Sequence, residues 1–140
     1  MASIYKEITI NVDLLSVWDA VRDVGNVHTR FVPGYAAKTS INGDTRILTM
    51  SNGNVVKELI IDIDDRNYRL SYAVIETQMP ITYHHASFQV FHEGENSSRL
   101  VWITDILPHK LEPEVRIRVD RGAMVIKQTL ESYYANKTKL

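Results

Sequence analysis

The amino-acid sequence predicts an α+β fold in which an antiparallel sheet of about seven strands is followed by a long C-terminal helix. Three observations lead to this prediction. The spacing of apolar residues changes from a helical period to strict alternation at residue 35, and it becomes helical again after Pro108. Two Asn-Gly pairs lie inside the alternating region, where they favour tight hairpin turns. The predicted order is a strand, two short helices, six strands and a long helix.

The elements before residue 35 are short. Residues 4–10 carry isoleucines at alternate positions, which is typical of a strand. A helix is predicted over residues 14–21, because the apolar residues there recur at intervals of three and four and form one stripe. Asp13 is its expected N-cap, since its carboxylate can accept hydrogen bonds from the free amides of the first turn. A second short helix is predicted over 27–31, and Pro33-Gly34 ends it.

The central region predicts an antiparallel meander. Two pairs, Asn42-Gly43 and Asn52-Gly53, separate its first three strands. In the strand over 55–64, Leu59 and Ile61 make the outward face apolar as well as the inward one, so the pattern predicts either a β-bulge near position 61 or an apolar outer patch. The six predicted strands are 35–41, 45–50, 55–64, 68–76, 83–91 and 99–107.

The C-terminal helix is predicted to begin near Pro113, a residue that suits a first helical turn. At about 25 residues and about 1.5 Å per residue it would span roughly 37 Å, which is enough to cross a sheet. Gly122 lies in its middle. Because glycine inside a helix costs about 1 kcal/mol relative to alanine, this position indicates either close packing or access for a ligand.

Composition and motifs exclude several classes of function. The chain has no cysteine, which excludes disulfides, thiolate catalysis and iron–sulfur clusters. The net charge of −1 lacks the basic excess typical of proteins that bind nucleic acid, so no nucleic-acid partner is expected. We expect neither a signal peptide nor an integral membrane segment, because no apolar run is long enough. The expectation is therefore one domain over residues 1–140, in a cytoplasmic monomer or homodimer.

No metal or cofactor is predicted. His84 and His85 are neighbours on a strand and so point to opposite faces, which prevents both from binding one ion. The sequence has no glycine-rich phosphate loop, nucleophile elbow or dinucleotide fingerprint.

Short motifs recur in a specific order along almost the whole chain: Val17-Trp18, Phe31-Val32-Pro33-Gly34, Gly43-Asp44-Thr45-Arg46, Gly53 with Glu58, Leu70-Ser71-Tyr72, Pro80-Ile81, and Val101-Trp102 leading to Pro108. Together they resemble the START-like (SRPBCC) superfamily, whose birch-pollen-allergen-like members share the helix-grip fold. The similarity is to its polyketide cyclase/dehydrase and lipid-transport branch. It implies a curved sheet wrapped around the long helix, with an internal cavity between them. The turn at Ser51-Asn52-Gly53-Asn54 departs from the proline-containing gate of plant abscisic-acid receptors, so that hormone role is not expected.

The candidate binding residues are polar side chains embedded in the apolar strand faces. Arg46 and Glu58 form either a cross-strand ion pair or part of a ligand pocket, and the resemblance favours the pocket for Glu58. His84 is either a satisfied wall residue or a ligand contact or general acid/base, and Tyr72 lies on the same inward face of the sheet. Apolar walls are expected from Leu48, Met50, Tyr72, Val74, Phe88, Val119, Ala123 and Ile126.

The favoured function is binding or transport of a hydrophobic small molecule, lipid-, polyketide- or isoprenoid-like, without catalysis. The alternative is a polyketide aromatase/cyclase or dehydratase, in which Glu58 and His84 would perform acid–base chemistry and Tyr72 would donate a proton. A third hypothesis is a protein-interaction module whose interior is filled by side chains.

Overall fold

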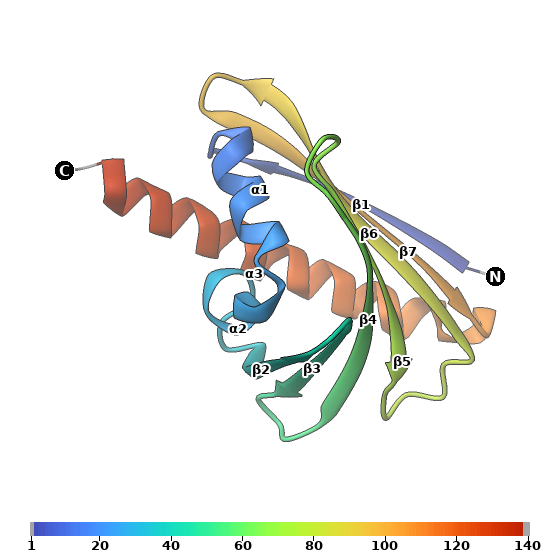
Figure 1. Cartoon of the computed structure of the whole chain (residues 1–140). Helices are drawn as coiled ribbons and strands as arrows, with labels where there is room; N and C mark the ends of the chain where they lie inside the picture. Colours follow the sequence, from blue (N-terminus) through green and yellow to red (C-terminus); the bar gives the residue numbers. More distant parts are fainter. Residues whose placement is uncertain (1, 139–140) are drawn as a thin grey trace.

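The computed structural model describes the backbone of residues 2–138 and the side chains of residues 2–135 (Figure 1). Its first half contains β1 (Ala2–Ile10), α1 (Leu14–Arg22), the 3-10 turn η1 (Val24–Asn26), α2 (Val27–Arg30), β2 (Ala36–Asn42), β3 (Thr45–Met50) and β4 (Val55–Asp64). Its second half contains β5 (Arg69–Glu76), β6 (Tyr83–Gly94), β7 (Ser97–Leu107), the 3-10 turn η2 (His109–Leu111) and α3 (Glu112–Thr138).

Within residues 2–138, seven strands form one sheet in the order β1-β7-β6-β5-β4-β3-β2, and each neighbouring pair is antiparallel. The sheet curves around α3, which crosses its inner side, while α1 and α2 lie at one end (Figure 1). This arrangement confirms the predicted α+β helix-grip architecture. In the part of the chain that the structure describes, no helix is both long and apolar enough to cross a membrane.

A β-bulge in β4 accounts for the ambiguous pattern of that strand. Ile60 pairs with Tyr72 and Asp62 pairs with Ser71, so Ile61 is an extra residue without a partner on β5. Ile61 is also 48% exposed, and Leu59 is exposed beside it. The sequence left a bulge and an apolar outer patch as alternatives, and both are present.

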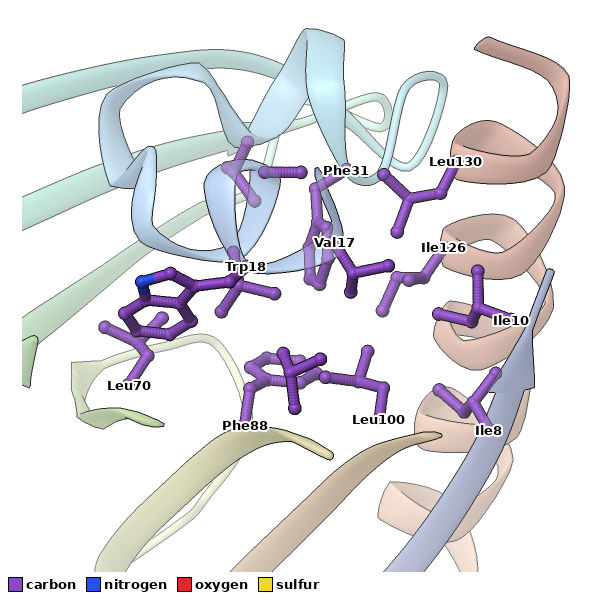
Figure 2. Close-up of a cluster of buried hydrophobic side chains, with 14 of the residues drawn as sticks. Ile8, Ile10, Val17, Trp18, Phe31, Leu70, Phe88, Leu100, Ile126 and Leu130 are labelled. Carbon is purple, nitrogen blue, oxygen red and sulfur yellow. The ribbon is translucent and has the colours of Figure 1, made fainter. Parts of the chain in front are cut away.

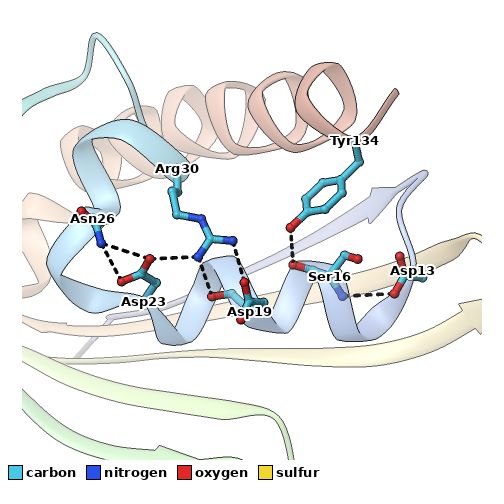
Figure 3. A network of polar contacts seen from close by, with 7 residues as sticks. All are labelled: Asp13, Ser16, Asp19, Asp23, Asn26, Arg30 and Tyr134. Carbon is cyan, nitrogen blue, oxygen red and sulfur yellow. Dashed lines mark hydrogen bonds and ion pairs between the residues drawn. The ribbon is translucent and has the colours of Figure 1, made fainter. Parts of the chain in front are cut away.

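Polar contacts fix the two short helices at one end of the sheet (Figure 3). The carboxylate of Asp13 accepts a 3.1 Å hydrogen bond from the amide of Ser16, as expected of the N-cap of α1. Arg30 in α2 donates to the carboxylates of Asp19 (2.7 Å) and Asp23 (2.9 Å) on α1 and just after it. These contacts hold α2 against α1, beside the second half of α3.

Side chains from α1, the sheet and α3 meet in one buried cluster (Figure 2). Aromatic rings occupy its centre: Phe88 lies 4.7 Å from Trp102, 5.2 Å from Phe31 and 5.9 Å from Tyr72, measured between ring centroids. A methyl group on Gly122 would lie 3.1 Å from Cη2 of Trp102. Gly122 therefore allows α3 to approach the indole, which is the packing explanation of this glycine.

Candidate functional site

A groove of about 550 Å³ lies beside the first half of α3. We call it the α3 groove. The α2–β2 loop, the β3–β4 turn, the β5–β6 connection and α3 all contribute to its lining. Its apolar side chains include Met50, Val56, Met79 and Ile117.

Local hydrogen bonds build the wall of the α3 groove that lies opposite the helix. The β3–β4 turn is closed by a 2.8 Å bond from the Met50 amide to the Asn54 carbonyl, and Gly53 adopts a φ of +90° that favours glycine. Ser51 joins this turn to the neighbouring loop, because its amide donates to the Tyr35 carbonyl and its hydroxyl donates to the Gly34 carbonyl. The wall is thus formed by the chain itself before any ligand arrives.

The lining of the α3 groove is amphipathic. Ile117 is 59% exposed in the middle of the helical face that lines the groove. Its charged neighbours in the lining are Glu114, Arg118 and Arg121. An apolar surface bordered by a few polar groups is the usual composition of a small-molecule site.

The second hollow, of about 520 Å³, is a wedge between the end of β5 and the start of β6. Ladder pairing of these strands stops at Tyr72 and Ala86. Beyond that pair the amide of Val74 donates a 2.9 Å hydrogen bond to Nδ1 of His84, in place of a backbone carbonyl. The wedge shares Thr77 and Met79 with the α3 groove, so this short segment separates the two hollows.

His84 is held as a neutral ring. Because Nδ1 accepts the hydrogen bond from Val74, the ring proton is assigned to Nε2. Burial lowers the pKa of His84 to about 4, and the nearby His85 adds to this effect. At neutral pH the ring therefore carries no charge, and His84 can offer an N–H donor to the wedge.

Arg46 and Glu58 form an ion pair. They are register partners on β3 and β4, and both Nη2 (2.6 Å) and Nε (2.8 Å) of the guanidinium contact Oε1 of the carboxylate. Arg46 is 4% exposed and Glu58 is 6% exposed. The guanidinium also lies over the ring of Tyr72, 5.6 Å from its centroid. The negative charge of Glu58 is thus balanced inside the protein, and neither residue lines the α3 groove or the wedge.

Tyr72 is similarly engaged in the core. Its hydroxyl accepts a 3.1 Å hydrogen bond from Nε1 of Trp102. Burial, and then the negative charge of Glu58, raise the pKa of Tyr72 above its usual value. The phenol therefore holds its proton firmly, which disfavours a role in proton transfer.

The structure separates the predicted site residues into three places. Met50 lines the α3 groove, whereas Val74 and His84 line the wedge. The others are packed in the interior, where aromatic rings take up the space between sheet and helix: Arg46, Leu48, Glu58, Tyr72, Phe88, Val119, Ala123 and Ile126.

Of the residues that line the α3 groove, sequence reasoning named only Met50 as a site residue, and it missed Met79, Ile117, Arg118 and Arg121 among others. Met79 lies in a connection whose path the sequence does not define. Ile117 gave a usable signal, because it is an apolar residue on a helical face that is otherwise charged. Among the described residues, no group of three or more histidines, aspartates or glutamates is placed to hold a metal ion.

Comparisons with known proteins agree with this architecture. Among solved structures, the Bacillus cereus protein XoxI superimposes with a TM-score of 0.83 at 19% identity, covering 99% of each chain. Norcoclaurine synthase from Thalictrum flavum gives a TM-score of 0.72 at 19% identity, covering 91% of this chain and 84% of that one. The di-domain aromatase/cyclase (ARO/CYC) BexL of the BE-7585A biosynthetic pathway gives 0.82 at 11% identity, covering 94% of this chain and 47% of that one. At these identities the likeness shows the fold alone.

The sequence comparisons identify the family. A search of curated proteins gave no match. The family described as "Polyketide cyclase / dehydrase and lipid transport" matches residues 1–132, which is nearly the whole chain. This match confirms the resemblance found in the sequence, and the chain therefore belongs to the polyketide cyclase/dehydrase and lipid-transport family.

Proposed function

We propose that this protein binds or carries an apolar small molecule in the α3 groove. The observation that supports this most directly is the groove itself, about 550 Å³ in volume with Met50, Val56, Met79 and Ile117 on its surface. Hollows of roughly 300–1,000 Å³ accommodate small organic ligands. The family description, which includes lipid transport, is consistent with such a role.

The position of Ile117 gives this proposal a physical basis. An isoleucine that is 59% exposed on a helix leaves apolar surface in contact with water. A ligand that covers this surface gains about 25 cal/mol for each Å² of apolar area that is buried. The hydrogen-bonded wall at Ser51 reduces the cost of ordering the site on binding, because the turn is already in place.

The enzymatic alternative, a polyketide aromatase/cyclase or dehydratase, has less support. It requires Glu58, His84 and Tyr72 to act on one substrate. Glu58 is paired with Arg46, Tyr72 is hydrogen-bonded to Trp102, and only His84 of the three lines a hollow. We therefore assign the α3 groove to binding rather than to acid–base chemistry.

Fluorescence titration with 1-anilinonaphthalene, an uncharged apolar probe, tests the proposal. We expect saturable binding to the protein and a loss of about tenfold or more in affinity for Ile117→Asp, because a carboxylate placed against the probe must lose its water. Met124→Asp is the matched control. Met124 lies on the same helix, is 63% exposed and does not line the α3 groove. Absence of saturable binding, or equal affinities for the two variants, would contradict the proposal.

A further inference from the structure

We infer that the ligand of the α3 groove is an amphipathic anion, with an apolar body over Ile117 and a carboxylate, sulfonate or phosphate head held by Arg118 and Arg121. This inference rests on the proposed binding function and adds the chemical class of the ligand. It is based on the charges that line the groove and on how each charge is paired.

The two arginines lie on one side of α3. Residues three apart on a helix are neighbours on its surface, about 5–6 Å apart between Cβ atoms, so both guanidiniums border the same stretch of the groove. Ile117 precedes them on that face and supplies the apolar contact. A single ligand head can therefore reach both arginines while its body covers the isoleucine.

The carboxylate in the lining does not neutralise both arginines. Glu114 approaches Nη2 of Arg118 at 3.5 Å, which is long compared with the roughly 2.7–2.9 Å of a charge-assisted hydrogen bond. Within the side chains that the structure describes, Arg121 has neither an ion pair nor a hydrogen bond. The lining of the groove thus keeps a surplus of one positive charge, and Arg121 has its donors free for a ligand.

Most other arginines of the chain differ from Arg121 in this respect. Closer carboxylate partners, at 2.9 Å or less, are found for Arg22, Arg30, Arg46, Arg99 and Arg116. An unpaired arginine beside an apolar groove is suited to a ligand that has both an apolar body and an anionic head. A planar guanidinium can bind a carboxylate or phosphate head with two parallel hydrogen bonds.

A matched pair of probes tests the inference. The compound 8-anilino-1-naphthalenesulfonate has the ring system of 1-anilinonaphthalene with a sulfonate added. We expect the sulfonate to bind about tenfold more tightly, since two exposed ion pairs each contribute modestly. The Arg118→Gln/Arg121→Gln double variant should abolish this difference between the two probes. Arg116→Gln, which removes an arginine of α3 outside the groove, should retain it.

Displacement of the uncharged probe by dodecanoate, dodecyl phosphate and dodecanol then distinguishes the head groups. We expect either anion to displace the probe more effectively than the alcohol, and the stronger one identifies the preferred head. If the uncharged probe binds but the sulfonate has no advantage, or if the advantage survives in the double variant, the inference is wrong while the binding function stands. If the uncharged probe does not bind at all, the proposed function itself fails.

Discussion

At the scale of single residues, the main finding concerns Glu58, a buried carboxylate for which the sequence left a ligand contact and an ion pair as alternatives. Glu58 lies inside an apolar sheet face, and a carboxylate there is stable only if a partner compensates for the loss of water. Arg46 is that partner, at 2.6 Å. The pair is a structural unit, so its removal should be visible in stability before it is visible in binding.

We expect Glu58→Gln to destabilise the protein by about 3 kcal/mol, because it leaves the guanidinium of Arg46 buried without a counter-charge. The double variant Arg46→Met/Glu58→Leu should recover most of this loss, since it removes both charges together. Urea unfolding curves measure both effects. The control is Glu76→Gln, which breaks the exposed pair with Lys57 and should cost less than about 1 kcal/mol. Equal losses for Glu58→Gln and Glu76→Gln would contradict a structural role for the buried pair.

His84 makes the stability of the protein depend on pH. Its pKa is lowered from 6.5 to about 4 in the folded state, so the unfolded chain binds the extra proton more readily between these values. The stabilisation is complete above pH 6.5 and is lost as the pH falls toward 4. The contribution of His84 to the slope of the unfolding free energy against pH cannot exceed about 1.4 kcal/mol per pH unit, and partial exposure of the ring to water reduces it.

Unfolding free energies measured across that interval should therefore rise with pH in the native protein and remain nearly flat in His84→Gln. Glutamine can still accept the hydrogen bond of the Val74 amide but does not titrate there. Carboxylates with lowered pKa values affect stability near and below their ordinary values, which are 3.8 for Asp23 and Asp65 and 4.5 for Glu131, so the upper part of the interval isolates the effect of His84. An unchanged slope in the glutamine variant would show that another group is responsible.

At the scale of elements, the contact between α3 and the sheet depends on Gly122. Its neighbour Trp102 is restrained by stacking on Phe88 and by donating to Tyr72, so the indole cannot move away easily. Alanine would favour the helix by about 1 kcal/mol, but its methyl group would lie 3.1 Å from the ring. These two effects on the free energy of unfolding oppose one another. Because the ring is restrained, we expect the close contact to outweigh the gain in helix propensity.

A double-mutant cycle measures this contact. We expect Gly122→Ala to destabilise the protein by about 1 kcal/mol when Trp102 is present, and to stabilise it by a similar amount in a Trp102→Leu background, where the six-membered ring is absent. Thermal or urea unfolding of the four proteins gives the coupling energy. If the effects of the two substitutions are additive, with a coupling energy below about 0.5 kcal/mol, then contact with Trp102 does not explain why position 122 is a glycine.

Element positions could be predicted from sequence because they depend on short-range patterns. Alternation located every strand of the meander, and the Asn-Gly pairs located two of its turns, with Gly43 and Gly53 both at positive φ. The 3-10 turns η1 and η2 were missed, since such short segments carry no apolar period. Alternation also does not reveal whether an extra residue such as Ile61 bulges outward.

At the scale of the whole molecule, the sequence predicted the fold, the family and a cavity between sheet and helix, but it did not predict most of the residues that line the α3 groove. Six strands between helices, together with motifs spread over the chain, were sufficient for the architecture. The α3 groove combines Met50, Met79 and Ile117 from separate segments of the chain. Patterns along the chain define which face of a strand is inward, but not whether that inward space is occupied.

The indole of Trp102, which β7 carries, packs against the backbone of Gly122 on α3. Its contact with Gly122 limits how closely α3 can approach the strand. The spacing between helix and sheet is therefore matched to one large ring and one absent side chain, so that either residue can be replaced only with an adjustment of the other.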